Sequence, residues 1–167
     1  MDYNSHFEKF REFESGGCIY KHKDVDESGV DYCENLTIAT DKAELGHTVH
    51  MLPVLHAKDP RRSTILSDAK LNKNPDLRID GILFEVEHPT KPKKLNNLNH
   101  RISAGANQAD DLIIFLDESI EINQMRRCSK SNFIYHPSLK RIEFKYKETY
   151  IVFNREDFIY NKKEPLQ

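Results

Sequence analysis

Residues 74–116 read NPDLRIDGILFEVEHPTKPKKLNNLNHRISAGANQADDLIIFL, and this stretch decides the fold. Asp80-Gly81 separates two short runs in which apolar and polar residues alternate. An Asp-Gly pair between alternating runs is a strong signal for a two-residue hairpin turn, because both residues tolerate a positive φ. The sequence therefore predicts a β-hairpin whose strands cover residues 76–79 and 82–87.

The second predicted strand carries two carboxylates on one face. Side chains alternate along a strand, so Glu85 and Glu87 project to the same side, with Cα atoms roughly 6.5–7 Å apart. Such a pair can bind a divalent cation, or one member can act as a general base. The same pair can also be a solvated strand face that pairs with nearby lysines.

The rest of the chain is predicted to alternate short helices and strands, because its apolar residues recur at helical or strand spacing between Gly, Pro and Asp signals. Phe7, Phe10 and Phe13 indicate an amphipathic first helix that Gly16-Gly17 would end. Before the hairpin, the expected elements are a helix over 1–17, a strand or loop over 18–28, a helix from Asp31 that Gly46 ends, a strand over 48–55 and a polar flap over 56–73. After it, we expect a helix over 95–108, an apolar central strand over 112–116 and a helix that Asp117 caps and that runs through Arg127. A hairpin of 141–146 and 149–153 and a frayed tail from Asn161 end the chain.

These elements favour an α+β fold in which N-terminal helices pack on a small, mainly antiparallel sheet of four to five strands. No internal repeat or low-complexity linker interrupts the chain, so residues 1–160 are expected to form a single nuclease-like domain. Residues 161–167 are expected to be a tail.

Composition describes an ordinary soluble protein, with 38% hydrophobic and 31% charged residues in 167. No apolar run is long enough for a membrane span, and the first residues lack the apolar core of a signal peptide. The formal charge of −2 weighs against non-specific coating of nucleic acid but leaves room for a locally basic groove. Cys18, Cys33 and Cys128 lack ligand or redox spacing, which favours isolated thiols.

Histidines and cations follow the two carboxylates. His88 or His100 could protonate a leaving oxygen, and Arg101 could bind the scissile phosphate. Adjacent helical residues do not share a face, so His100 and Arg101 are not expected to point at one atom. A basic loop that could also hold phosphate, or be merely solvated, contains Lys91, Lys93 and Lys94.

Asp76 and Asp80 open a metal-dependent alternative. Pro75-Asp76 and Glu85-Val86-Glu87 resemble the core pattern of the PD-(D/E)XK nucleases, in which acidic residues hold magnesium and a lysine orients water. The resemblance implies magnesium ligands at Asp76, Glu85 and Glu87. Glu87 stands where that family has its lysine, so Lys91 or Lys93 would have to supply the missing cation.

The strings NPDLRIDGILFEVEHPT and GANQADDLIIFL resemble the C-terminal nuclease domains of bacterial polymorphic toxins, including contact-dependent inhibition effectors, over about residues 29–153. Many such domains belong to the barnase–EndoU–colicin–RelE class, which cleaves RNA without a metal. The resemblance implies an active cleft formed by the face of Glu85 and Glu87 and by the helix of His100 and Arg101. Gln108 would line that cleft, and Arg78 would contribute from the adjoining strand.

The working hypothesis is a toxin-type RNA endonuclease, with tRNA as the expected RNA. Glu85 or Glu87 would be the base and His88 or His100 the acid, and no cofactor would be needed. The enzymatic alternative is a magnesium-dependent nuclease, and the non-enzymatic one is an inactive binding module or mobile-element accessory. A cognate immunity protein is a candidate partner and no membrane partner is expected. Action in the cytoplasm would follow delivery by a secretion or fused system.

Overall fold

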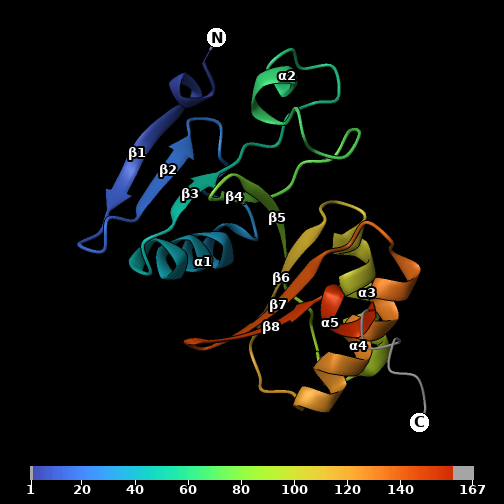
Figure 1. The fold of residues 1–167 in the computed structure, drawn as a ribbon. Helices are drawn as coiled ribbons and strands as arrows, with labels where there is room; N and C mark the ends of the chain where they lie inside the picture. The colour runs from blue at the N-terminus through green and yellow to red at the C-terminus, as the bar shows by residue number, and fades with distance from the viewer. Residues whose placement is uncertain (1, 160–167) are drawn as a thin grey trace. The chain divides into compact units, whose positions relative to one another are not determined.

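The structure is a computed structural model that describes residues 2–159. Its contacts divide the chain into two compact units, which we call unit 1 (Met1–Val86) and unit 2 (Glu87–Gln167). Figure 1 shows the elements of both units along the chain. No helix of the described residues is long and apolar enough to cross a bilayer.

Unit 1 is built around a mixed sheet with one helical crossover. Its elements are η1 (Tyr3–His6), β1 (Phe7–Glu12), β2 (Cys18–His22), α1 (Tyr32–Glu44), β3 (Thr48–Met51), α2 (Arg62–Ile65), β4 (Leu77–Ile79) and β5 (Ile82–Glu87), whose last residue begins unit 2. Strands β1 and β2 are antiparallel, β2 and β3 are parallel, and β3, β4 and β5 are antiparallel. Because parallel strands need a long connection, α1 carries the chain from β2 back to β3.

The loop before β2 passes close to the end of α1. Ile38, Ala39 and Ala43 form the buried stripe of this helix. A Cβ atom placed on Gly17 would lie 1.9 Å from the Ala43 carbonyl oxygen. Glycine is therefore required where the chain turns into the sheet against the helix.

The predicted hairpin is confirmed. Asp80 and Gly81 both have positive φ angles, of 46° and 86°. The register places Leu77 opposite Phe84 and Ile79 opposite Ile82. Leu77, Ile79 and Phe84 are buried, whereas Ile82, next to the turn, is 44% exposed.

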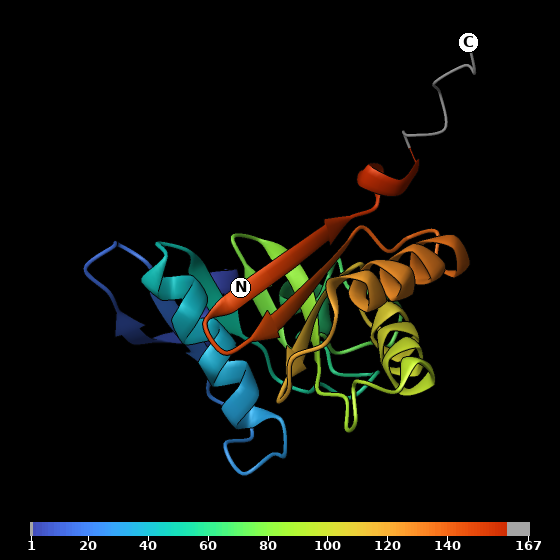
Figure 2. The same ribbon diagram turned by 90° about the horizontal axis from the view of Figure 1, so that it is seen from below.

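Unit 2 combines a three-stranded ladder with two longer helices. Its elements are α3 (Leu95–Ala106), β6 (Asp111–Leu116), α4 (Ile122–Tyr135), β7 (Arg141–Tyr146), β8 (Thr149–Asn154) and α5 (Glu156–Ile159). Strands β6 and β7 are parallel through the crossover of α4, whereas β7 and β8 are antiparallel. Helices α3 and α4 lie side by side, as Figures 1 and 2 show, and their apolar faces share one core with the strands.

The expected fold class is wrong. Residues 2–159 form eight strands and five α-helices, and the β2–β3 and β6–β7 pairings are parallel, so the fold is not N-terminal helices on four to five antiparallel strands. The helix expected over 1–17 is instead η1, β1 and a turn. The three-residue spacing of its phenylalanines suggested a helix, but Phe7 is buried while Phe10 is 44% exposed, because β1 pairs with β2 at the sheet edge.

Other elements agree with the sequence in kind and differ at their ends. The helices beginning near Asp31 and Leu95 and the final hairpin are confirmed. The helix expected from Asp117 to Arg127 begins only at Ile122 and continues to Tyr135, and its N-cap makes no side-chain hydrogen bond. The strand expected over 48–55 ends at Met51. The tail expected from Asn161 lies outside the described residues.

Candidate functional site

Asp76 lies directly before β4, where donors from α1 and β5 hold its carboxylate. Its Oδ1 accepts a hydrogen bond from Asn35 Nδ2 on α1 at 3.1 Å, and its Oδ2 accepts one from the Val86 N–H at 2.9 Å. The Asp76 N–H in turn donates to the Phe84 carbonyl at 3.1 Å. The carboxylate is therefore fixed in place before any ligand arrives.

Glu85 belongs to the same small region. The N–H that Asp76 accepts is part of the peptide unit that joins Glu85 to Val86. The hairpin thus brings the Asp76 carboxylate to the backbone that joins Glu85 to Val86. Glu85 is partly buried, so its carboxylate is not simply a solvated surface charge.

A pocket of about 200 Å³ adjoins Asp76 within unit 1, between the N-terminal part of α1, the loop before it and the residues after β3. Hydrogen bonds keep two of its carboxylates ionised: Arg61 lowers the pKa of Asp24, and Ser28 lowers the pKa of Asp26. An ionised, acid-rich pocket attracts cations. Its polar lining consists of Asp24, Asp26, Asp31, Asp76, Asn35 and Tyr32.

The donor set of this pocket suits magnesium. Within residues 2–159, no three or more His, Cys, Asp and Glu side chains gather as a metal cage. Magnesium in phosphoryl-transfer sites, however, uses one or two protein carboxylates and completes its shell with water and phosphate oxygens. Asn35 Oδ1 is buried and has no hydrogen-bond partner among the described residues, so a hard oxygen donor beside Asp76 is available to a cation.

Glu87 stands at the position where the PD-(D/E)XK pattern has its lysine, and it belongs to unit 2. It is 8% exposed, and Arg101 Nη1 approaches its Oε2 at 3.4 Å. The close fit depends on Gly105, since a Cβ atom there would lie 3.0 Å from Glu87 Cγ. The structure brings Glu87 and Arg101 together as an ion pair against α3.

His88 is held by Asp117, which the sequence pattern indicated only as a helix cap. Its Nε2 lies 2.7 Å from Asp117 Oδ2, and its ring packs edge-on against Phe115. His100 is exposed on α3. A histidine oriented by an aspartate is suited to proton transfer, so His88 is the better placed of the two predicted acids.

The predicted phosphate-binding residues differ in how far their charges are already engaged. Arg78 donates to both carboxylate oxygens of Asp68 at 2.7 Å and to the carbonyls of Ile65 and Gly81 at 3.0 Å. Lys93 pairs with Glu118 at 2.9 Å, whereas Lys91 and Lys94 are exposed. Gln108 is partly buried just after α3, and no role in binding follows from its position.

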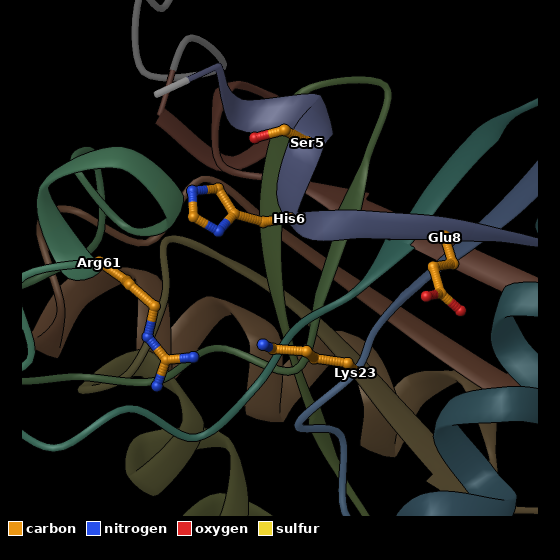
Figure 3. Close-up of a pocket in the computed structure, with 5 residues that line it drawn as sticks. All are labelled: Ser5, His6, Glu8, Lys23 and Arg61. Carbon is orange, nitrogen blue, oxygen red and sulfur yellow. The ribbon is translucent and has the colours of Figure 1, made fainter.

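A second pocket of unit 1 contains residues that the sequence reasoning missed. Its volume is about 390 Å³, and Figure 3 shows the side chains of Lys23 and Arg61 extending toward one another near His6. Ser5 and Glu8 complete its lining. These residues come from three distant segments, and the pattern of the first favours a helix, so no spacing in the sequence could have gathered them. Asn35 was missed for a similar reason: a lone helical asparagine carries no signal until Asp76 is placed beside it.

Comparisons with known proteins agree with the toxin resemblance. Residues 73–144 match the family model of the contact-dependent growth inhibition CdiA C-terminal domain. A search of curated proteins found no match. Among solved structures, a chain of a CdiA-CT/CdiI toxin and immunity complex from Burkholderia pseudomallei is similar, with a TM-score of 0.52 and 17% identity over 77% of this chain and 88% of that chain.

The structural likeness shows a shared fold, and the family match covers the stretch with the hairpin, α3, β6, α4 and most of β7. The resemblance inferred from the sequence is therefore confirmed over residues 73–144, which match the C-terminal domain family of contact-dependent growth inhibition proteins.

Proposed function

We propose that the chain is a toxin that cleaves the phosphodiester bonds of RNA, with tRNA as the expected substrate and Asp76 and Glu85 as the central catalytic carboxylates. The observation that carries the proposal is the Asp76 carboxylate, which Asn35 and the Val86 N–H orient at the peptide of Glu85. Donors from two elements hold both oxygens of this carboxylate, which orients it for a ligand.

Magnesium is the cofactor that fits these residues. Asp76, Glu85 and Asn35 Oδ1 would hold it, and the bound ion would supply charge stabilisation and a more acidic water. Asn35 keeps the Asp76 carboxylate in one orientation through its Nδ2, while the Val86 N–H fixes the other oxygen. The acidic lining of the pocket raises the local concentration of cations.

The test measures cleavage of labelled tRNA and duplex DNA with magnesium or with EDTA. We expect Asp76→Asn and Glu85→Gln each to lower the cleavage rate at least about 100-fold, and EDTA to abolish it. Glu14→Gln is the matched control, because Glu14 is an exposed carboxylate of unit 1. Full activity of Asp76→Asn, or full activity in EDTA, would rule the assignment out.

The His88–Asp117 pair favours a second candidate, in which the same RNA is cleaved without a metal. His88 would donate the proton to the leaving oxygen, and Glu85 or Glu87 would be the base. In that case EDTA leaves the rate unchanged, while His88→Ala lowers it by about 100-fold or more. The two candidates therefore give opposite results in the same assay.

A cognate immunity protein and cytoplasmic action after delivery complete the proposal. They are supported by the family match and by the description of the structural neighbour as a toxin and immunity complex. Expression of the chain inside bacteria should stop growth, and Asp76→Asn should relieve the arrest. A candidate immunity protein must both restore growth and co-purify with the chain.

A further inference from the structure

Charge is divided unevenly between the two units. Unit 1 has 11 Lys and Arg against 16 Asp and Glu, a formal charge of −5. Unit 2 has 14 against 11, a formal charge of +3. A polyanion such as RNA is repelled by the carboxylates proposed to cut it, so its affinity must come from cations elsewhere.

The exposed face of α4 gathers such cations. Asn123, Arg126, Arg127 and Lys130 recur at three- and four-residue intervals, which places them on one side of the helix. Together with Asp157 and Phe158 of α5 they line a hollow of about 480 Å³. We call these six residues the α4 groove.

The cations of the α4 groove are not paired with carboxylates of the described residues. Within residues 2–159, Arg126, Arg127 and Lys130 form no ion pair, whereas Lys140 and Arg141 of the same unit have carboxylate partners. Asp157 Oδ2 already accepts the Asn154 N–H at 3.1 Å. Like charges three and four residues apart repel, so the arrangement opposes folding and suits an anionic ligand.

Aromatic residues of the core of unit 2 pack beneath the α4 groove. The guanidinium of Arg126 lies over the ring of Phe153, 5.8 Å from its centre. Phe158 packs against Phe133 and Phe153, which belong to the core of unit 2. The base of the groove is therefore apolar and ordered, while its rim is cationic.

We propose that the α4 groove binds the phosphate backbone of the nucleic acid on which the chain acts. The assignment rests on the proposed function for the identity of the ligand. Arg and Lys contacts to phosphates carry affinity without reading sequence, which matches a site with three cations and few directional acceptors. RNA fits better than an acidic protein surface, because closely spaced phosphates neutralise three neighbouring cations at once.

The test compares RNA binding by two triple variants, both in the Asp76→Asn background so that the probe stays intact. One variant is Arg126→Gln, Arg127→Gln, Lys130→Gln, which keeps helix propensity. The control is Lys9→Gln, Arg11→Gln, Lys58→Gln, which removes the same charge from exposed positions of unit 1. Fluorescence anisotropy of a labelled single-stranded RNA gives Kd as salt is varied, and circular dichroism checks folding.

We expect the α4 groove variant to raise Kd at least about tenfold at low salt, and to make the slope of log K against log salt shallower by about 2, which is three contacts at about 0.7 each. The control should change Kd by less than about twofold. An unchanged Kd and slope in the groove variant would overturn the proposal. The same holds if the groove variant loses binding of an immunity protein while its RNA binding is unchanged.

The outcome also separates this proposal from the proposed function. If Asp76→Asn cleaves RNA normally while the groove variant binds RNA weakly, the catalytic assignment fails and the groove stands. If Asp76→Asn abolishes cleavage while the groove variant binds RNA normally, the catalytic assignment is supported and RNA binds elsewhere on the protein.

Discussion

His50, on β3, has an aromatic environment that disfavours its charged form. Its ring stacks on Tyr20 at 5.0 Å and meets Phe7 edge-on at 4.9 Å. Burial, and then the positive charge of Arg78, lower the pKa of His50 from 6.5 to about 4. The unfolded chain therefore binds a proton at pH values where the folded chain does not.

Unit 1 should consequently lose stability on acidification. The contribution of His50 is complete above pH 6.5 and falls as the pH drops from 6.5 towards about 4, by roughly 1–3 kcal/mol. Urea unfolding at a series of pH values measures it. His50→Phe keeps the ring contacts and should flatten the slope, apart from the part due to His22, whose pKa burial also lowers. An equal slope in wild type and His50→Phe would contradict the argument.

Single residues also mark where sequence reasoning stops. The pattern of β5 predicted that Glu85 and Glu87 are paired carboxylates, and the hairpin that carries them is confirmed. It could not predict that Glu87 is buried against Arg101, because that depends on Gly105 allowing α3 to pack closely. Likewise, Asn35 becomes informative only through its hydrogen bond to Asp76.

At the scale of the elements, the loop before β2 passes so close to α1 that it leaves no room for a side chain at Gly17. Gly17→Ala would place a methyl group 1.9 Å from the Ala43 carbonyl oxygen, so the loop or the helix end must move. We expect a loss of about 2–3 kcal/mol in the free energy of unfolding. Thermal or urea unfolding measures the loss.

Gly16→Asn is the matched control for this change. Gly16 has a φ of 87°, and a Cβ atom placed on it would have no other atom within 4 Å. Asparagine tolerates that backbone conformation better than other residues. Its effect should be clearly smaller than that of Gly17→Ala. Equal effects would mean that backbone conformation, not the close approach, limits this turn.

Elements were predictable where one local signal dominates. Asp80-Gly81 fixes a turn, and regular apolar spacing defines α1 and α3. The conformation of residues 1–17 was not predictable, because Phe7, Phe10 and Phe13 fit a helical stripe as well as a strand. Its pairing with β2, through contacts such as Phe7 opposite His22, decides for a strand.

At the scale of the whole molecule, the three free cysteines report on separate regions. Cys18 is buried in unit 1 and Cys128 in unit 2, whereas Cys33 is exposed at the start of α1. Burial also raises the pKa of Cys128 to about 11, which leaves little reactive thiolate at neutral pH.

Thiol labelling followed by mass spectrometry should therefore distinguish the three sites. Cys33 should react at once in the native protein, and Cys18 and Cys128 at least about 100-fold more slowly, since they require local opening. Cys33→Ser should remove the fast phase. Labelling of Cys128 as fast as that of Cys33 would show that the core of unit 2 opens readily.

The architecture as a whole was the least predictable feature. Strand and helix positions in the sequence do not say which strands lie side by side, and the two parallel pairings turn an expected antiparallel sheet into a mixed one. Hydrophobic alternation is the same in both cases for strands of four to six residues. The toxin resemblance, by contrast, came directly from residues 74–116 and was confirmed.

The two parallel pairings have one more consequence. Cys18 pairs with Thr48 in unit 1 and Asp111 with Arg141 in unit 2, so each pairing closes over 30 residues with one helix between. Short closures cost little chain entropy and form early. A chain that leaves a ribosome or a translocation pore amino end first can thus complete the β2–α1–β3 segment before the β6–α4–β7 segment appears. Refolding after passage through such a pore can therefore proceed one segment at a time.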